Sequence, residues 1–325
     1  MSSCVAEGFL QSRTLPPFLT IPVELPNRKT GHVNIGHPCP WAHFGWHIDP
    51  LSKRGWTFQE FLLARRVLFY GPYELLFHCQ ELGFRALAQS YINYPSNEQP
   101  SSKVFFNSSD RHGSWCELLR QYTFRTLSVY DDRPQAIAGV VVALEEAWGD
   151  RCVFGAWVSY FLEHLTWFNV ANFHLHPSLE RSNRAPSWSW LSIDGHVAIL
   201  CRSKLRADCT ITTNLLDVAK GAKLTLACRL ISQLEWPSLE SSRFTIYWDL
   251  EQSGEAGVKP CFYLYLGSES YQTSEQWFHA FALITIEEQT DVLRRIGIID
   301  IHTRDVATMR DVEKKLQTRR HVALV

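Results

Sequence analysis

The chain has 325 residues, of which 46% are hydrophobic and 20% are charged, and its formal net charge is −1. This balance is typical of a globular protein and argues against a disordered chain, a coiled coil or a collagen-like rod. Because there is no basic excess, we expect no nucleic-acid partner. The length suggests about two domains.

The tryptophan content is high, with 12 Trp in the chain. An indole ring buries a large apolar area and needs a partner for its N–H group. The surplus therefore indicates either a Trp-rich core or an aromatic-lined pocket for an apolar small molecule. Composition alone leaves both alternatives open.

The sequence predicts a cytoplasmic protein with no membrane span. The N-terminus does not show the basic and apolar regions of a signal peptide. The longest strongly apolar run, from Ala136 to Leu144, is too short to cross a bilayer. The nine Cys are odd in number and widely spaced, as in a reduced intracellular protein.

Residues 1–90 form the first predicted region. Residues 1–50 are rich in Pro, Gly and His and are expected to be loop or extended chain. The segment WTFQEFLLARR predicts an amphipathic helix over 56–66, closed by Arg65 and Arg66. The next segment, 67–79, predicts a hairpin around a Gly-Pro turn. The polar stretch 90–113 is the expected loop between domains.

Residues 114–200 form a predicted helical region. Ser114, with Glu117 three residues later, predicts a capped helix that ends near Thr126. Asp131 or Asp132 is expected to cap a second, buried helix that ends at Gly149. A third helix is expected over 156–168, followed by an extended Trp-rich segment over 184–197.

Residues 205–325 change to a period-two pattern and form the third predicted region. The expected strands are 223–231, 243–250, 261–267, 281–288 and 294–301, followed by an exposed helix over 303–322. The predicted fold class is therefore α+β, with a mixed helical middle region packed on a largely antiparallel C-terminal sheet or small barrel.

The densest set of polar candidates follows residue 50. Arg54, Trp56, Gln59, Glu60 and Arg66 lie on or beside the first helix. Glu60 either forms a buried ion pair with an arginine that fixes the helix, or acts as a general acid or base. The other four are candidate substrate-binding residues in the second case.

A histidine cluster precedes this helix. His43 and His47 are four residues apart, but Phe44 stands where an H-E-x-x-H zinc motif needs Glu. We therefore expect no metal, and assign both as candidate proton-transfer groups beside Glu60. The sequence has no G-x-G-x-x-G, P-loop or G-x-S-x-G motif, so no cofactor is predicted. The aromatic candidates for substrate binding are Trp41, Trp46, Trp56, Trp188 and Trp190.

The segment PLSKRGWTFQEFLLARRVLFYG resembles the closing block of the fungal heterokaryon-incompatibility (HET) domain, R-x-W-T-x-Q-E-x-x-L-x-x-R-x-L-x-F. The matching residues are Arg54, Trp56, Thr57, Gln59, Glu60, Leu63, Arg66, Leu68 and Phe69. Segments 130–140, 149–168, 185–195 and 293–301 are similar to the usual C-terminal extension of these proteins. Only about 50 residues precede the block, so 1–90 is expected to be a remnant of the domain.

The resemblance implies a fungal protein from a family implicated in nonself recognition and cell death. Because the N-terminal half of the domain is not recognisable, we expect a truncated or repurposed relative that acts through protein or ligand binding. The alternative is a cofactor-free cyclase or isomerase (pericyclase-type), or a binding protein, of fungal secondary metabolism with an aromatic-lined pocket. A pocket with Glu60 or a His in its wall would favour the enzyme.

Overall fold

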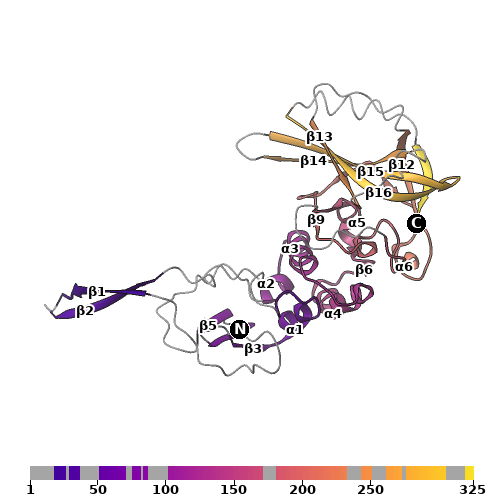
Figure 1. Ribbon diagram of the computed structural model, residues 1–325. Coiled ribbons are helices and arrows are strands. Elements are labelled where there is room, and N and C mark those ends of the chain that lie inside the picture. Colours follow the sequence, from indigo (N-terminus) through magenta and orange to yellow (C-terminus); the bar gives the residue numbers. More distant parts are fainter. Residues whose placement is uncertain are drawn as a thin grey trace. The chain divides into compact units, whose positions relative to one another are not determined.

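A computed structural model describes residues 18–26, 29–36, 51–70, 75–81, 83–86, 102–170, 181–232, 243–250, 261–272, 276–304 and 319–325. The chain divides into two compact units, residues 1–108 and 109–325, and each is described by itself (Figure 1). The division falls within the predicted interdomain stretch. Within the described ranges, no helix is long and apolar enough to span a membrane.

The N-terminal unit contains a hairpin within the segment expected to be loop or extended chain. Strands β1 (Phe18–Glu24) and β2 (Thr30–Gly36) pair in antiparallel register, with Leu19 opposite Ile35. The alternation of apolar and polar residues in both strands is the period-two pattern of a sheet. The strands agree with the extended chain expected over 1–50, but their pairing into a hairpin was not predicted.

The helix of the motif block is shorter than predicted. Helix α1 spans Thr57–Leu63, and Ala64 is already extended. Arg66 does not close the helix but begins β3 (Arg66–Tyr70), where it pairs with Cys79 of β4 (Leu75–Cys79). The predicted hairpin is thus confirmed, and β5 (Gly83–Ala86) adds a third antiparallel strand. Helix α2 (Ser102–Phe106) lies in the stretch predicted as loop.

The C-terminal unit begins with two long helices. Helix α3 spans Arg111–Thr123, and its cap is Asp110, whose carboxylate accepts the Gly113 N–H at 2.9 Å; the predicted Ser114 cap is wrong. Helix α4 spans Gln135–Trp148 and ends at Gly149, as predicted, with φ of 62°. The predicted aspartate cap of α4 is wrong, because Asp131 and Asp132 lie in the 3-10 turn η2 (Tyr130–Asp132).

The predicted helix over 156–168 is broken into short elements. They are β6 (Cys152–Val153), β7 (Ala156–Trp157), η3 (Val158–Tyr160), α5 (Phe161–His164) and β8 (Trp167–Asn169). The ring Nδ1 of His164 accepts the Trp157 N–H at 3.0 Å, so this backbone group is satisfied outside a helix. Gly155, with φ of 81°, makes the turn between β6 and β7.

The Trp-rich segment also differs from its prediction. Residues 184–197 form turns, the 3-10 helix η4 (Trp190–Ser192) and the start of β9 (Val197–Ile199), not one extended run. The Ser189 hydroxyl caps η4 by accepting the Leu191 N–H at 3.1 Å. Trp188 and Trp190 therefore do not share one face of a strand.

The C-terminal sheet confirms the α+β prediction. Its strands are β10 (Arg206–Ala207), β11 (Thr210–Ile211), β12 (Leu224–Ser232), β13 (Arg243–Trp248), β14 (Cys261–Gln272), β15 (Gln276–Gln289), β16 (Val292–Thr303) and β17 (Arg319–Leu324). The order is β10-β14-β15-β16-β17-β12-β11, with β13 on β16, and a further β14–β12 pairing makes the sheet ring-like without forming a barrel. All pairs are antiparallel except β16 with β17.

The end of the chain differs from the predicted helix over 303–322. Residues 305–318 lie outside the described ranges, and Arg319 onward belongs to β17. In β17 the apolar Val322 and Leu324 alternate with exposed or half-buried neighbours, which is a strand pattern. Short helix α6 (Leu215–Val218) precedes β12.

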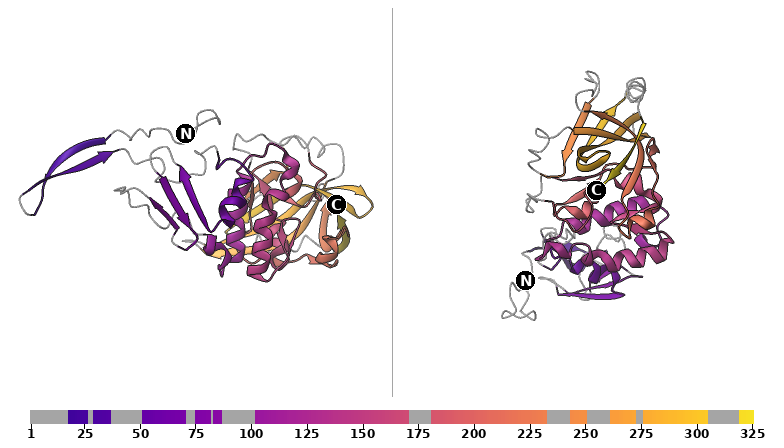
Figure 2. Two further views of the ribbon diagram at one scale, coloured as in Figure 1. Left: turned by 90° about the horizontal axis from the view of Figure 1, so that it is seen from below. Right: turned by 90° about the vertical axis from the view of Figure 1, so that its right-hand side faces the viewer.

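The helical region of the C-terminal unit lies against the sheet (Figure 2), and a hydrophobic core joins the two. Phe161 and Trp188 from the helical region pack with Phe281, Leu283 and Leu324 from the sheet. The described tryptophans of the helical region are nearly all buried, which explains much of the surplus by core packing: Trp115, Trp148, Trp157, Trp167, Trp188 and Trp190.

Candidate functional site

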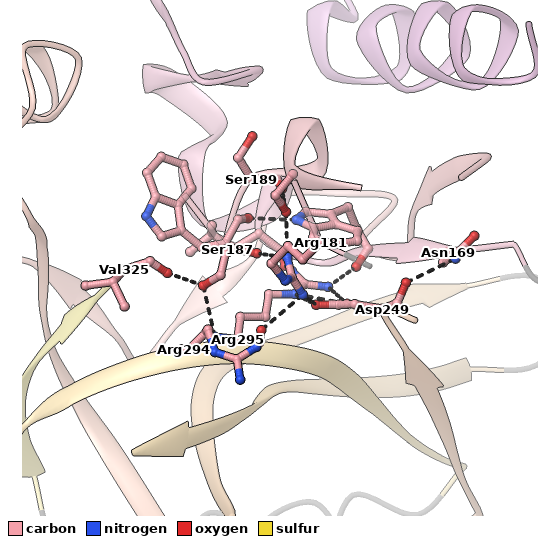
Figure 3. A network of polar contacts seen from close by, with 12 residues as sticks. Asn169, Arg181, Ser187, Ser189, Asp249, Arg294, Arg295 and Val325 are labelled. Carbon is pink, nitrogen blue, oxygen red and sulfur yellow. Dashed lines mark hydrogen bonds and ion pairs between the residues drawn. The ribbon is translucent and has the colours of Figure 1, made fainter. Parts of the chain in front are cut away.

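A buried charge network ties the helical region to the sheet (Figure 3). Arg295 of β16 and Arg181 converge on the carboxylate of Asp249, which follows β13. The Arg295 Nε lies 3.2 Å from Oδ2, and a terminal nitrogen of Arg181 lies 2.7 Å from the same oxygen. The network holds together segments that are far apart in the sequence.

Arg295 is the most buried member, with 0% of its residue surface exposed. Its guanidinium donates to the carbonyl of Leu165 at 2.6 Å and to the carbonyl of Trp167. Burial lowers the pKa of Arg295 to about 10, although the Asp249 carboxylate acts to raise it. The guanidinium therefore keeps its charge at neutral pH.

Arg181 organises the Trp-rich segment. Its terminal nitrogens donate to the Ser187 carbonyl at 2.7 Å, the Ser192 hydroxyl at 2.5 Å and the Arg295 carbonyl at 3.1 Å. Ser187 in turn donates its N–H to the Val325 carbonyl at 3.1 Å and accepts the Arg295 N–H at 3.1 Å. The serines of this segment are thus structural hydrogen-bonding groups.

Arg181 and Arg295 share the single side-chain carboxylate of Asp249. In addition, the Nε of Arg181 is buried without a hydrogen-bond partner. A buried donor atom without a partner is costly in a medium of low dielectric constant.

A pocket of about 510 Å³ opens beside this network, and the described residues that line it all belong to the C-terminal unit. Its floor is made of buried side chains, among them Val218, Leu224 and Leu324. Its rim includes the exposed residues Ala222 and Lys223, in the loop that follows α6. Neither His, Asp, Glu nor Tyr occurs among the described residues that line it.

Among the described residues that line the pocket, the ionisable side chains are cationic: Arg181, Arg184, Lys223 and Arg294. Their acidic partners do not line the pocket. Arg184 is paired with Asp194 and lies 3.5 Å from Asp131, and Arg294 lies 2.6 Å from Glu288. For Lys223, no carboxylate partner occurs within the described ranges.

Two of the predicted substrate-binding residues belong to this unit. Trp188 lines the pocket, but only 1% of it is exposed, and Phe154 and Phe161 pack against its ring at 5.7 and 5.4 Å between centroids. Trp190 does not line it. Its N–H donates to the Gly155 carbonyl at 3.0 Å, and Arg133 lies 5.2 Å from its ring, so Trp190 is a core residue.

The other described candidates belong to the N-terminal unit. Glu60 is exposed, so the expectation that it forms a buried ion pair is wrong. Gln59 is half-buried, and Trp56 is 36% exposed. Arg54 and Arg66 are exposed. Trp41, His43, Trp46 and His47 lie outside the described residues.

A second buried polar cluster surrounds two histidines that the sequence did not single out. The Nδ1 of His164 accepts the Trp157 N–H, so its proton is on Nε2, which faces the Nδ1 of His112 at 3.2 Å. The Nε2 of His112 then donates to the Cys201 carbonyl at 2.9 Å. Burial, His112 and Lys204 hold the pKa of His164 well below its usual value. The cluster has a complete hydrogen-bond chain and is structural.

Sequence reasoning missed Arg181, Asp249 and Arg295. One signal was present, because Arg295 follows Arg294 directly in an apolar strand, which places one of the two side chains on the inward face. Within the described ranges, His, Cys, Asp and Glu form no group of three that could hold a metal ion. Comparisons with protein-family models, curated proteins and solved structures find no match to this chain.

Proposed function

We propose that this protein is a heterokaryon-incompatibility-like protein whose C-terminal unit binds a small amphipathic molecule in the pocket beside the Arg181–Asp249–Arg295 network. The motif block from Arg54 to Phe69 supports the first half of this proposal. The pocket supports the second half, since it combines an apolar floor with a few converging polar groups, as small-molecule sites do.

The observation that carries the binding proposal is the fixed wall of the pocket. The segment from Arg181 to Ser192 is held by the hydrogen bonds of Arg181, and Ser187 is bonded to both Val325 and β16. A wall that is already ordered loses little conformational entropy when a ligand binds. This arrangement favours binding over a role as a solid structural core.

The cyclase alternative receives less support. It requires an acid–base group such as Glu60 or a histidine in the wall of an aromatic cavity. The described lining contains neither, and its aromatic residues are Phe154 and the nearly covered Trp188. Glu60 belongs to the other unit and is exposed. We therefore propose binding without chemical conversion.

Titration of the full chain with 8-anilino-1-naphthalenesulfonate tests this function, because the dye fluoresces in apolar sites. Ala222→Trp would fill the pocket from its rim, and Ala219→Trp places the same bulk at an exposed position outside the lining. We expect saturable binding that Ala222→Trp abolishes and Ala219→Trp retains. Binding that is absent, or that survives both substitutions equally, would contradict the proposal.

A further inference from the structure

Strand β13 lies at an edge of the C-terminal sheet. Within the described ranges, β16 is its only strand partner, and Trp248 lies opposite Gly297 in their antiparallel register. One residue further on, the N–H of Asp249 donates to the carbonyl of Ile296 at 3.0 Å. Because 249 and 296 are directly opposite in this register, they form a hydrogen-bonded pair.

The directions of the main-chain groups of β13 follow from this pair. Hydrogen-bonded and non-hydrogen-bonded pairs alternate along an antiparallel ladder. Counting back from the hydrogen-bonded pair, the main-chain groups of Thr245 and Tyr247 face β16. Those of Phe244, Ile246 and Trp248 face the opposite edge, and within the described ranges they have no hydrogen-bond partner there.

This edge carries an exposed apolar face. The side chains of Phe244, Ile246 and Trp248 alternate onto one face of the strand, where Ile246 packs against the core of the sheet. Phe244 is 52% exposed and Trp248 is 38% exposed. The segment 244–248 contains no charged residue, proline or glycine, which are the residues that usually protect an edge strand. Such an edge is suited to pairing with another strand.

A second copy of the same strand fits this edge. A two-fold axis at Ile246 places Ile246 opposite its own counterpart and Phe244 opposite Trp248 of the second copy. Each outward-facing residue then meets another outward-facing residue, and each pair can exchange both of its backbone hydrogen bonds. The axis also repeats the contact between Phe244 and Trp248, so two aromatic pairs form on the exposed face.

Other two-fold registers fit less well. An axis at Thr245 leaves Trp248 without an outward-facing partner in the second β13, and an axis at Tyr247 leaves Phe244 without one. The register about Ile246 therefore uses all three outward-facing residues of β13.

We infer that β13 pairs with the β13 of a second copy of this chain, antiparallel and centred on Ile246, and thereby joins two C-terminal sheets into one. The interface is independent of the proposed ligand binding, because β13 contributes no residue to the lining of the pocket. A contact made by one short strand from each copy is small, so we expect a dissociation constant of about 10–100 µM.

Hydrogen exchange of the full chain tests the register without any substitution. Exchange is measured residue by residue at concentrations about 10-fold below and above the expected dissociation constant. We expect the amides of Phe244, Ile246 and Trp248 to become protected in the concentrated sample only. The amides of Thr245 and Tyr247 should be protected in both samples, because they donate to β16. Sedimentation velocity at the same concentrations should show conversion of monomer to dimer.

A matched pair of variants locates the interface. Phe244→Glu replaces an exposed aromatic side chain with a charge, and should weaken dimerisation about 10-fold or more because the two-fold axis repeats the loss. Val142→Glu introduces the same charge at a 62% exposed apolar position of α4 and should leave dimerisation unchanged. Adding Trp248→Lys to Phe244→Glu places opposite charges across the axis and should restore part of the lost affinity.

Two results would overturn the inference. The first is a chain that sediments as a monomer at every concentration, with the three outward-facing amides exchanging at an unchanged rate. The second is a dimer that Phe244→Glu and Val142→Glu weaken equally, because its interface would then lie elsewhere. Either result leaves the proposed binding function standing, since the dye titration measures the pocket separately.

Discussion

The guanidinium carbon of Arg295 lies 3.6 Å from the centre of the Trp167 indole ring, and the same guanidinium donates to the Trp167 carbonyl. The Trp167 N–H in turn donates to the Trp188 carbonyl at 2.7 Å. The planar guanidinium stacks on the aromatic face and donates hydrogen bonds to several acceptors at once. A lysine ammonium cannot reproduce this geometry. This contact joins β16, β8 and the Trp-rich segment.

The substitution Arg295→Lys therefore destabilises the protein although it keeps the charge. The buried ammonium would lose the fork geometry to Asp249 and the two carbonyls, and we expect a loss of about 3 kcal/mol in the free energy of unfolding. Arg294→Lys, at the neighbouring, partly exposed position, should change it by less than about 0.5 kcal/mol. Chemical denaturation measures both, and equal effects would contradict the assigned role of Arg295.

The carboxylate of Asp249 is expected to be as important as its arginine partners. Asp249→Asn would leave Arg181 and Arg295 buried without a counter-charge, which costs about 3–5 kcal/mol. Asp217→Asn changes an exposed aspartate paired with Lys220 at 3.7 Å, and its effect should stay within about 0.5 kcal/mol. Similar stabilities of the two variants would show that the network is not a structural requirement.

Two glycines with left-handed backbones give a steric test of the core. Gly149 and Gly155 have φ of 62° and 81°, so Ala strains both backbones by about 1–2 kcal/mol. A Cβ on Gly149 would meet nothing within 4 Å, whereas one on Gly155 would lie 2.2 Å from the Nε1 of Trp190. We expect Gly155→Ala to cost about 1–3 kcal/mol more than Gly149→Ala. Thermal unfolding compares them, and equal losses would show that Trp190 is not packed against Gly155.

The histidine pair predicts a dependence of stability on pH. Burial, then the neighbouring His112 and Lys204, hold the pKa of His164 well below 6.5, so the folded state keeps this imidazole neutral while the unfolded state takes up a proton. The neutral His164 therefore contributes fully to the free energy of unfolding above pH 6.5. This contribution is lost as the pH falls below 6.5, and the free energy of unfolding then declines by up to about 1.4 kcal/mol per pH unit.

The variant His164→Asn removes this titration and should flatten the decline of the unfolding free energy between pH 7.5 and 5.5. The control is His32→Asn, which removes an imidazole from an exposed position and should leave the decline as steep as in the parent. Denaturant unfolding at several pH values measures the slope for each protein. A decline in His164→Asn as steep as in the parent would contradict the predicted contribution.

Local sequence patterns predicted the strands better than the helices. The period-two alternation in β12 and in β14 to β16 requires only neighbouring residues, and the turn at Gly149 requires only its backbone freedom. The helix predicted over 156–168 is broken into short elements because contacts from outside the segment compete with helix formation. The carbonyl of Leu165, for example, accepts from Arg295, which lies 130 residues further along the chain.

The candidate site could not be predicted from local sequence patterns either, because it is built from residues far apart in the sequence. Among the candidates proposed from the sequence that lie in the described ranges, Trp188 lines the pocket and the others do not. The network itself joins Arg181 to Asp249 across 68 residues and Asp249 to Arg295 across 46, and no local spacing contains that information. The N-terminal candidates drew attention through their motif, but Glu60 is exposed and gains no buried partner.

The most direct test of the proposed site is acetylation footprinting of the full chain with and without 2-naphthoate, read by mass spectrometry at each lysine. If the pocket binds a small amphipathic molecule, the probe will protect Lys223 at the rim and leave Lys220, outside the lining, as reactive as before. Equal reactivity of Lys223 with and without 2-naphthoate, or equal protection of both lysines, would contradict the proposed site.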